Sequence, residues 1–266
     1  MNTPTIVNAC TRDGRGGNPT AVLTDGDYTD AERSALPAAH GASHAVFIAD
    51  HDGEHRLRFF TATGELPACG HATAAAIAVI AQGADTGDLV TTLRLRTSRR
   101  AFTATAHPEG TQTRVFFDPG PVAFRDAETP GPILTALGLD ADHPGVRIAG
   151  VARERLLVPL PDPAALAELK PDRDALKDAC AAAGLLGAYV HAPQATPGRH
   201  CARMFAPSIG VPEDIANANG TACLAAGLGG RIIVDMGDAL GVRARIEASA
   251  GPDGTVRLSA TAAIAR

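Results

Sequence analysis

A short helix that is apolar on every side is the feature that most limits how this chain can fold. Residues 59–82 read FFTATGELPACGHATAAAIAVIAQ, which predicts a strand over 56–61, a turn, and a helix that begins near Gly70 or His71. A helix without a polar face is normally buried, and this one is too short to cross a bilayer. We therefore expect it to lie in the protein core, covered by other elements.

The amino end of this helix is polar, because Glu65, Cys69 and His71 cluster there. Free N–H groups and the positive end of the helix dipole lie at the same end and favour a bound anion. Ionisable side chains beside these amides indicate a binding or catalytic site.

A second stretch near the carboxyl end resembles the first. Residues 213–228 read EDIANANGTACLAAGL, and ANGTACL at 218–224 aligns with ACGHATA at 68–74. Two similar units so far apart indicate a duplicated domain rather than a short-period repeat. The two helix ends would then face each other across one pocket. The alternative is that alanine-rich helices resemble each other by composition alone.

The length, charge and cysteine content of the chain suit a protein of two domains. A length of 266 residues and the breaker DPGP at 118–121 predict domains 1–118 and 119–266, the first completed by the last strand of the chain. A net charge of −5 gives no reason to expect nucleic acid or a membrane as a partner. The first residues do not resemble a signal peptide, so a cytoplasmic location is the default expectation. Five cysteines at scattered spacings support neither a disulfide framework nor a zinc site.

Short apolar and alternating runs predict many strands and few helices. Strands are expected at 5–9, 20–23, 43–48, 56–61, 89–95, 101–106, 113–117, 155–159, 187–191, 201–205, 242–248 and 256–263, and further helices at 29–40, 132–137, 163–169 and 172–183. This pattern favours an α+β fold in which each domain is a curled, mostly antiparallel sheet around one buried helix.

Three blocks, GNPTAV at 17–22, ELPACGHAT at 65–73 and RMFAPSIGVPED at 203–214, occur in the order and spacing of one family. In them the chain resembles the PhzF-like isomerases of phenazine biosynthesis, which share their fold with diaminopimelate epimerase and proline racemase. The resemblance implies a diaminopimelate-epimerase-like fold with the active site between the two helix ends. It also implies acid–base chemistry on a small carboxylate substrate without a metal or organic cofactor. A homodimer is a further expectation.

Two positions depart from the family's pattern. The phenazine-making members carry a catalytic glutamate where this chain has His44, in the stretch SHAVF at 43–47. Asn217 and Ala218 stand where threonine and glycine are usual. Both departures count against the phenazine precursor itself as the substrate.

The predicted catalytic residues are His44, His71 and Asp214. An imidazole titrates near neutrality, so His44 can take and return a proton; the alternative is a histidine that points to solvent at the start of a strand. The resemblance places His71 and Asp214 in the active site, where they would donate to the substrate carboxylate or share the proton. The alternative for these two is a residue of the helix end and a capping carboxylate.

The residues expected to bind the substrate lie mostly at the two helix ends. Cys69 is either a thiolate base, as in racemases of this fold, or a packing residue. The position that mirrors Cys69 is Asn219, which makes a pair of thiols an unlikely catalytic device. The predicted binding residues are Asn18, Cys69, Gly70, Ala72, Ala218, Asn219, Gly220 and Thr221.

The leading hypothesis is a cofactor-independent isomerase that shifts a proton, and with it a double bond, in a small unsaturated carboxylate or amino acid of specialised metabolism. The family suggests two substrate types, a dihydro-hydroxyanthranilate-like diene or an unsaturated pyrroline carboxylate. The alternatives are an amino-acid racemase, epimerase or dehydratase that uses Cys69, and a binding protein without activity.

Overall fold

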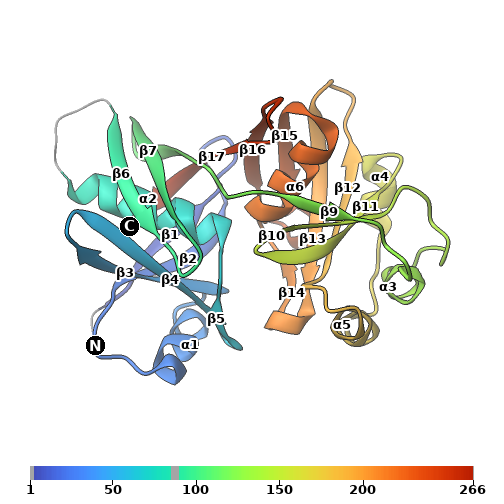
Figure 1. Ribbon diagram of the computed structural model, residues 1–266, viewed down its shortest axis with the longest axis horizontal. Coiled ribbons are helices and arrows are strands. Elements are labelled where there is room, and N and C mark those ends of the chain that lie inside the picture. Colours follow the sequence, from blue (N-terminus) through green and yellow to red (C-terminus); the bar gives the residue numbers. More distant parts are fainter. Residues whose placement is uncertain (1–2, 85–89, 266) are drawn as a thin grey trace.

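The computed structural model describes residues 3–84 and 90–265, and these form two lobes side by side (Figure 1). Their strands belong to one continuous sheet. Most neighbouring strands are antiparallel, and four pairs are parallel: β2–β3, β4–β6, β11–β12 and β13–β15. None of the described helices is long and apolar enough to cross a membrane.

The first lobe is a closed ring of strands around one helix, α2. The last strand of the chain pairs with both β1 and β8, and this pairing closes the ring. The strands are β1 (Thr5–Ala9), β2 (Asn18–Thr24), β3 (His44–His51), β4 (Glu54–Thr61), β6 (Thr91–Arg96), β7 (Ala101–Glu109), β8 (Gln112–Phe117) and β17 (Val256–Ile264), with the short β5 (Gly64–Leu66) beside β4.

Helix α2 (Gly70–Gly83) fills this ring. Its residues 70–78 are all buried, and it contacts strands on every side of the ring. The small side chains of this helix allow the surrounding strands to pack closely against it, because alanine needs little space between helix and sheet. Helix α1 (Asp30–Ala39) lies outside the ring and begins with a capping box formed by Thr29 and Glu32.

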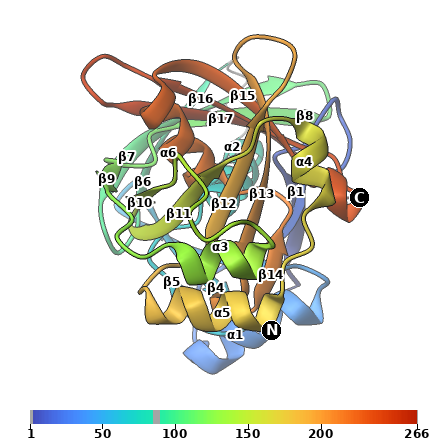
Figure 2. The ribbon, with the colours of Figure 1, turned by 90° about the vertical axis from the view of Figure 1, so that its right-hand side faces the viewer.

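The second lobe holds helix α6 (Ala218–Leu228), which packs against β10, β11, β15, β16 and β17. Three more helices, α3 (Gly131–Leu137), α4 (Pro163–Glu168) and α5 (Arg173–Ala182), lie on the outer side of this lobe over a separate apolar cluster (Figure 2). The strands are β9 (Ala123–Arg125), β10 (Arg147–Val151), β11 (Arg153–Pro159), β12 (Ala188–Pro193), β13 (Arg199–Ala206), β14 (Val211–Asp214), β15 (Gly230–Met236) and β16 (Ala244–Ala250).

Both predicted core helices are confirmed as buried helices, but five strands were not predicted: β5, β9, β10, β14 and β15. Strand β15 follows α6 without a polar linker. Gly229 and Gly230, both with positive φ, turn the chain directly from helix to strand there. The strand predicted at 89–95 is β6, and Leu89 itself lies outside the described residues.

Candidate active site

The amino ends of α2 and α6 touch each other. Gly70 is the first residue of α2 and Ala218 the first of α6. A methyl group built on Gly70 would lie 2.6 Å from Cβ of Ala218 and 3.2 Å from Oδ1 of Asn219. Only glycine therefore allows this approach, which brings two positive helix ends to one place.

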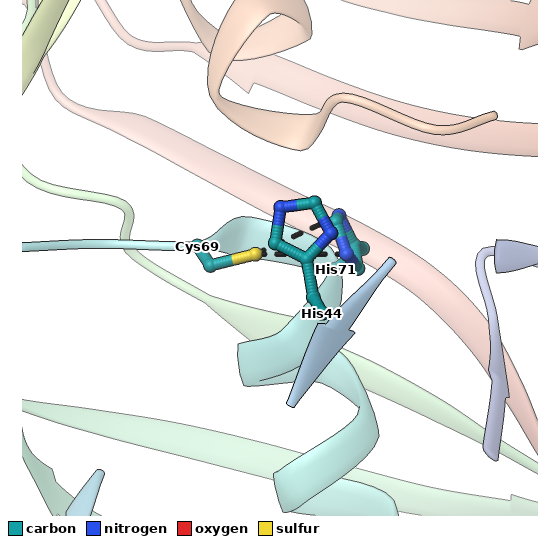
Figure 3. A group of neighbouring side chains, drawn as sticks. All are labelled: His44, Cys69 and His71. Atoms are coloured by element: carbon teal, nitrogen blue, oxygen red, sulfur yellow. Dashed lines mark hydrogen bonds between the residues drawn. The ribbon is translucent and has the colours of Figure 1, made fainter. Parts of the chain in front are cut away.

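His44, Cys69 and His71 gather at this junction (Figure 3). His44 begins β3 and reaches over the first turn of α2, and all three side chains are buried. The imidazole rings of His44 and His71 meet edge to face, with centroids 4.4 Å apart. Sγ of Cys69 lies 3.6 Å from Nε2 and 3.7 Å from Nδ1 of His71. Ser43 Oγ lies 2.8 Å from Nδ1 of His44 and orients that ring.

Burial keeps these three groups uncharged. It lowers the pKa of His44 well below its usual 6.5, and the neighbouring His71 lowers that pKa further. Burial also lowers the pKa of His71, while Asp214 acts in the opposite direction. Burial raises the pKa of the Cys69 thiol and outweighs the backbone N–H groups of the helix end, which act to lower it. The site at neutral pH therefore holds two neutral imidazoles and a thiol, so Cys69 is not a ready thiolate base.

Asp214, at the end of β14, is held by two asparagines. Its Oδ1 accepts a hydrogen bond from Nδ2 of Asn18 at 2.7 Å, and its Oδ2 accepts one from Nδ2 of Asn217 at 3.0 Å. Asn217 also caps α6, because its Oδ1 accepts from the N–H of Gly220 at 2.8 Å. This chain of contacts links β2, β14 and the amino end of α6.

Two adjoining cavities lie at the junction. A small one of about 30 Å³ is lined by His44, His71 and Asp214 among others, and a larger one of about 410 Å³ lies beside it. The larger one includes Phe59 and Phe102 in its wall. The residues that line both cavities are Ala68, Cys69, Gly70, Val151, Ala152 and Asn219.

The structure places some predicted binding residues at these cavities and others behind them. Cys69, Gly70, Ala218 and Asn219 line the small cavity. The others do not line it. Ala72 is packed in the core, and Asn18 donates to Asp214. The N–H of Gly220 donates to Asn217, and Thr221 Oγ1 bonds to the hydroxyl of Tyr189 at 2.9 Å.

Three polar residues of the small cavity were missed from the sequence: Arg153, Arg155 and Asn217. Asparagine before an apolar helical run is a common helix cap, and that preference could have identified Asn217. Arg155 lies in a strand that carries no recognisable motif. Only the tertiary structure therefore identifies it as a cavity residue.

The atoms of His44, Cys69 and His71 that could coordinate a metal lie within 4.8 Å of one another. Imidazole nitrogen and thiolate sulfur are ligands that suit zinc. The thiol, however, is kept protonated by burial, and a metal would have to displace that proton. That the protein works without a metal stays a prediction.

Buried neutral histidines predict that the protein becomes less stable in mild acid. The pKa values of His44, His71, His191 and His200 are all lowered on folding, that of His191 to about 4. Below pH 6.5 the unfolded chain therefore binds protons that the folded chain does not, and unfolding is favoured. A histidine shifted as far as His191 contributes a loss of about 2 kcal/mol at pH 5. Thermal unfolding followed by circular dichroism should show a falling Tm from pH 7 to pH 5; an unchanged Tm would contradict these shifts.

Comparison with known proteins agrees with the three sequence blocks. The sequence profile of one family, described as phenazine biosynthesis-like protein, matches residues 7–262. An uncharacterized isomerase of Escherichia coli K12, YddE, is 28% identical over 258 residues, which cover 93% of this chain and 86% of the relative. The trans-2,3-dihydro-3-hydroxyanthranilate isomerase of Pseudomonas aeruginosa is 30% identical over 229 residues, 85% of this chain and 79% of that protein.

Solved structures show the same fold. A PhzF-family phenazine biosynthesis protein of Bacillus anthracis superposes with a TM-score of 0.82 at 16% identity and covers 100% of this chain and 98% of its own. A hydroxyproline epimerase of Agrobacterium vitis superposes with a TM-score of 0.59 at 11% identity, over 99% of this chain and 90% of that one. At these identities the likeness establishes the fold alone, and that fold is consistent with the predicted diaminopimelate-epimerase-like one.

Proposed function

The chain belongs to the phenazine biosynthesis-like family and is an isomerase, and we propose that it moves a proton between two carbons of a small unsaturated carboxylate. The observation that carries this proposal is the pair of buried, neutral imidazoles of His44 and His71 at the meeting point of two helix ends. A neutral imidazole can accept a proton, and the helix ends stabilise the negative charge that then develops on the substrate.

In the proposed reaction, Nε2 of His44 removes a proton from a carbon next to a carboxylate or a conjugated double bond. Nδ1 of His44 is engaged by Ser43, which leaves Nε2 for this step. The electron pair of the broken C–H bond enters the conjugated system and shifts the double bond. The imidazolium of His44 then delivers that proton to another carbon and returns to its neutral form, while His71 lies beside it with its ring centroid 4.4 Å away. The reaction consumes no oxidant, reductant or water.

The substrate proposed is a small cyclic carboxylate. The large cavity, with Phe59, Phe102 and Phe117 in its wall, suits an apolar ring, and the small cavity receives the reacting edge. A dihydro-hydroxyanthranilate, as named for the Pseudomonas relative, and an unsaturated pyrroline carboxylate both meet this description. The second is slightly preferred, because His44 replaces the glutamate expected for the first.

We also propose that the two lobes are duplicated domains, 1–118 with the last strand and 119–266, and that the protein acts as a cytoplasmic homodimer. The similar positions of α2 and α6 within their lobes support the duplication.

The proposed function is tested by proton exchange in D2O. Unsaturated pyrroline and dihydro-anthranilate carboxylates are incubated with the enzyme, and ¹H NMR follows loss of carbon-bound proton signals and movement of the double bond. We expect exchange and isomerisation of at least one compound. Tight binding without exchange of any carbon-bound proton would instead support the non-catalytic alternative.

The racemase alternative makes a different prediction at Cys69. If the thiol only packs at the helix end, Cys69→Ser should keep kcat within about threefold of the wild type, because hydroxyl and thiol have similar size. A chelator should leave the activity of both proteins unchanged. Deuterium entering the α-carbon of an amino acid, with loss of this exchange in Cys69→Ser, would favour the racemase instead.

A further inference from the structure

Arg155, on β11, is a buried arginine without a carboxylate partner in the described part of the chain. Only 1% of its surface is exposed. Its Nη2 donates to the carbonyl of Arg153 at 3.1 Å, and its Nη1 lies 3.9 Å from Sγ of Cys223. Its buried Nε has no hydrogen-bond partner among the residues that the structure describes. Within residues 3–84 and 90–265, no carboxylate oxygen lies within 4.0 Å of its nitrogens. Arg155 thus carries a positive charge that the described part of the chain does not pair.

The groups around Arg155 do not compensate its charge. Burial raises the pKa of the Cys223 thiol, and it also raises the pKa of the Tyr189 phenol, so both remain neutral at pH 7. The carboxylate of Asp214 lines the same cavity, but its oxygens accept from Asn18 and Asn217. An unpaired charge in a protein interior is strongly destabilising. Such a charge is explained when a ligand supplies the missing anion.

Arg153 adds a second positive charge on the same side. Residues two apart on a strand point to the same face, and both arginines line the small cavity. Glu154, between them, forms an ion pair with Arg125 on the exposed side, so it does not neutralise them. The positive charge of Arg155 lowers the pKa of Arg153, after the larger effect of burial, which shows that the two cations repel each other.

We propose that Arg155 and Arg153 bind a carboxylate of the substrate in the small cavity, as an anchor additional to the two helix ends. This inference rests on the proposed function, since it assigns the acidic group of that substrate to a site. The planar guanidinium of Arg155 matches a carboxylate in shape and charge. Because β11 belongs to the second lobe and β3 to the first, one lobe holds the acid while the other moves the proton.

The test uses benzoate as the probe and benzamide, its neutral analogue, as the comparison. Titration calorimetry measures both ligands with the wild type, Arg155→Met, Arg155→Lys and the control Arg147→Met. Arg147 is exposed on the neighbouring strand β10. We expect benzoate to bind the wild type more tightly than benzamide, and Arg155→Met to lose about tenfold or more of the benzoate affinity. Benzamide binding, and both ligands with Arg147→Met, should be unchanged.

A second readout separates an anchor from a structural arginine. Without ligand, Arg155→Met should raise Tm, because it removes an unpaired buried charge. An unchanged benzoate affinity in Arg155→Met, or no binding of benzoate to the wild type, would overturn the inference. If Arg155→Met does not fold, the same comparison with Arg155→Lys decides, since weaker benzoate binding is expected there too.

The inference and the proposed function can fail separately. Benzoate binding that depends on Arg155, together with no proton exchange in D2O, would support the anion site and contradict the proposed isomerisation. Exchange of substrate protons with benzoate binding that is independent of Arg155 would overturn the anion site alone.

Discussion

Replacement of His44 by alanine is expected to lower kcat roughly a thousandfold, because it removes the proposed proton-transferring base. KM should change much less, since the helix ends still bind the substrate. His51, at the far end of the same strand, is exposed, and His51→Ala is the matched control that should keep full activity. Initial rates of the D2O-exchange reaction measure both variants. An unchanged kcat in His44→Ala would remove His44 from the mechanism.

The pH dependence of the wild type gives an independent check on His44. The neutral imidazole is the active form, and burial holds the pKa of His44 well below 6.5. Activity should therefore stay level at neutral pH and fall only in acid, as the pH drops toward this lowered pKa. His44→Glu, which carries the carboxylate that the family pattern has at this position, should retain more activity than His44→Ala.

Gly70→Ala is expected to lower kcat/KM about a hundredfold, although it adds a single methyl group and removes no titrating group. The new Cβ would lie 2.6 Å from Cβ of Ala218, closer than two carbon atoms can approach, so the helix ends must move apart. A displacement of about 1 Å in an active site can cost this much. Cys69 and His71, the neighbours of Gly70, would shift away from the residues of the second lobe.

Two variants make this prediction specific. Gly83→Ala, at the other end of the same helix, meets no atom of residues 3–84 or 90–265 within 4 Å. It should leave activity unchanged while stabilising the helix by about 1 kcal/mol. In the double variant Gly70→Ala with Ala218→Gly, the clashing methyl is removed and much of the activity should return. Rates equal to wild type in Gly70→Ala would show that close contact of the helix ends is not needed.

The core helices were predictable because their signal is local. A run of small apolar residues at 72–80 can only be buried, and the polar residues before it mark one end of the helix. The same reasoning identified α6. Strands β5 and β9, with three residues each, were not predictable, because partner strands rather than their own residues hold them in place.

The site was predictable only in part, since a motif names residues but not their surroundings. His71 and Asp214 lie in the sequence blocks and His44 in the stretch at 43–47, and the structure places all three at one small cavity. Ala72, Gly220 and Thr221 were predicted from the two similar helix ends yet do not line that cavity. Ala72 packs in the core, and the other two bond to Asn217 and Tyr189.

By itself, the sequence determined that two apolar helices are buried and that ionisable groups lie at their amino ends, because helix periodicity and polarity are properties of neighbouring residues. The tertiary structure alone decided that Gly70 meets Ala218, that burial makes both imidazoles neutral, and that Arg155 lies in the cleft without a carboxylate partner among the described residues. These properties depend on distance and solvent exclusion between segments far apart in the chain, which only the pairing of strands and the packing of the two lobes establish.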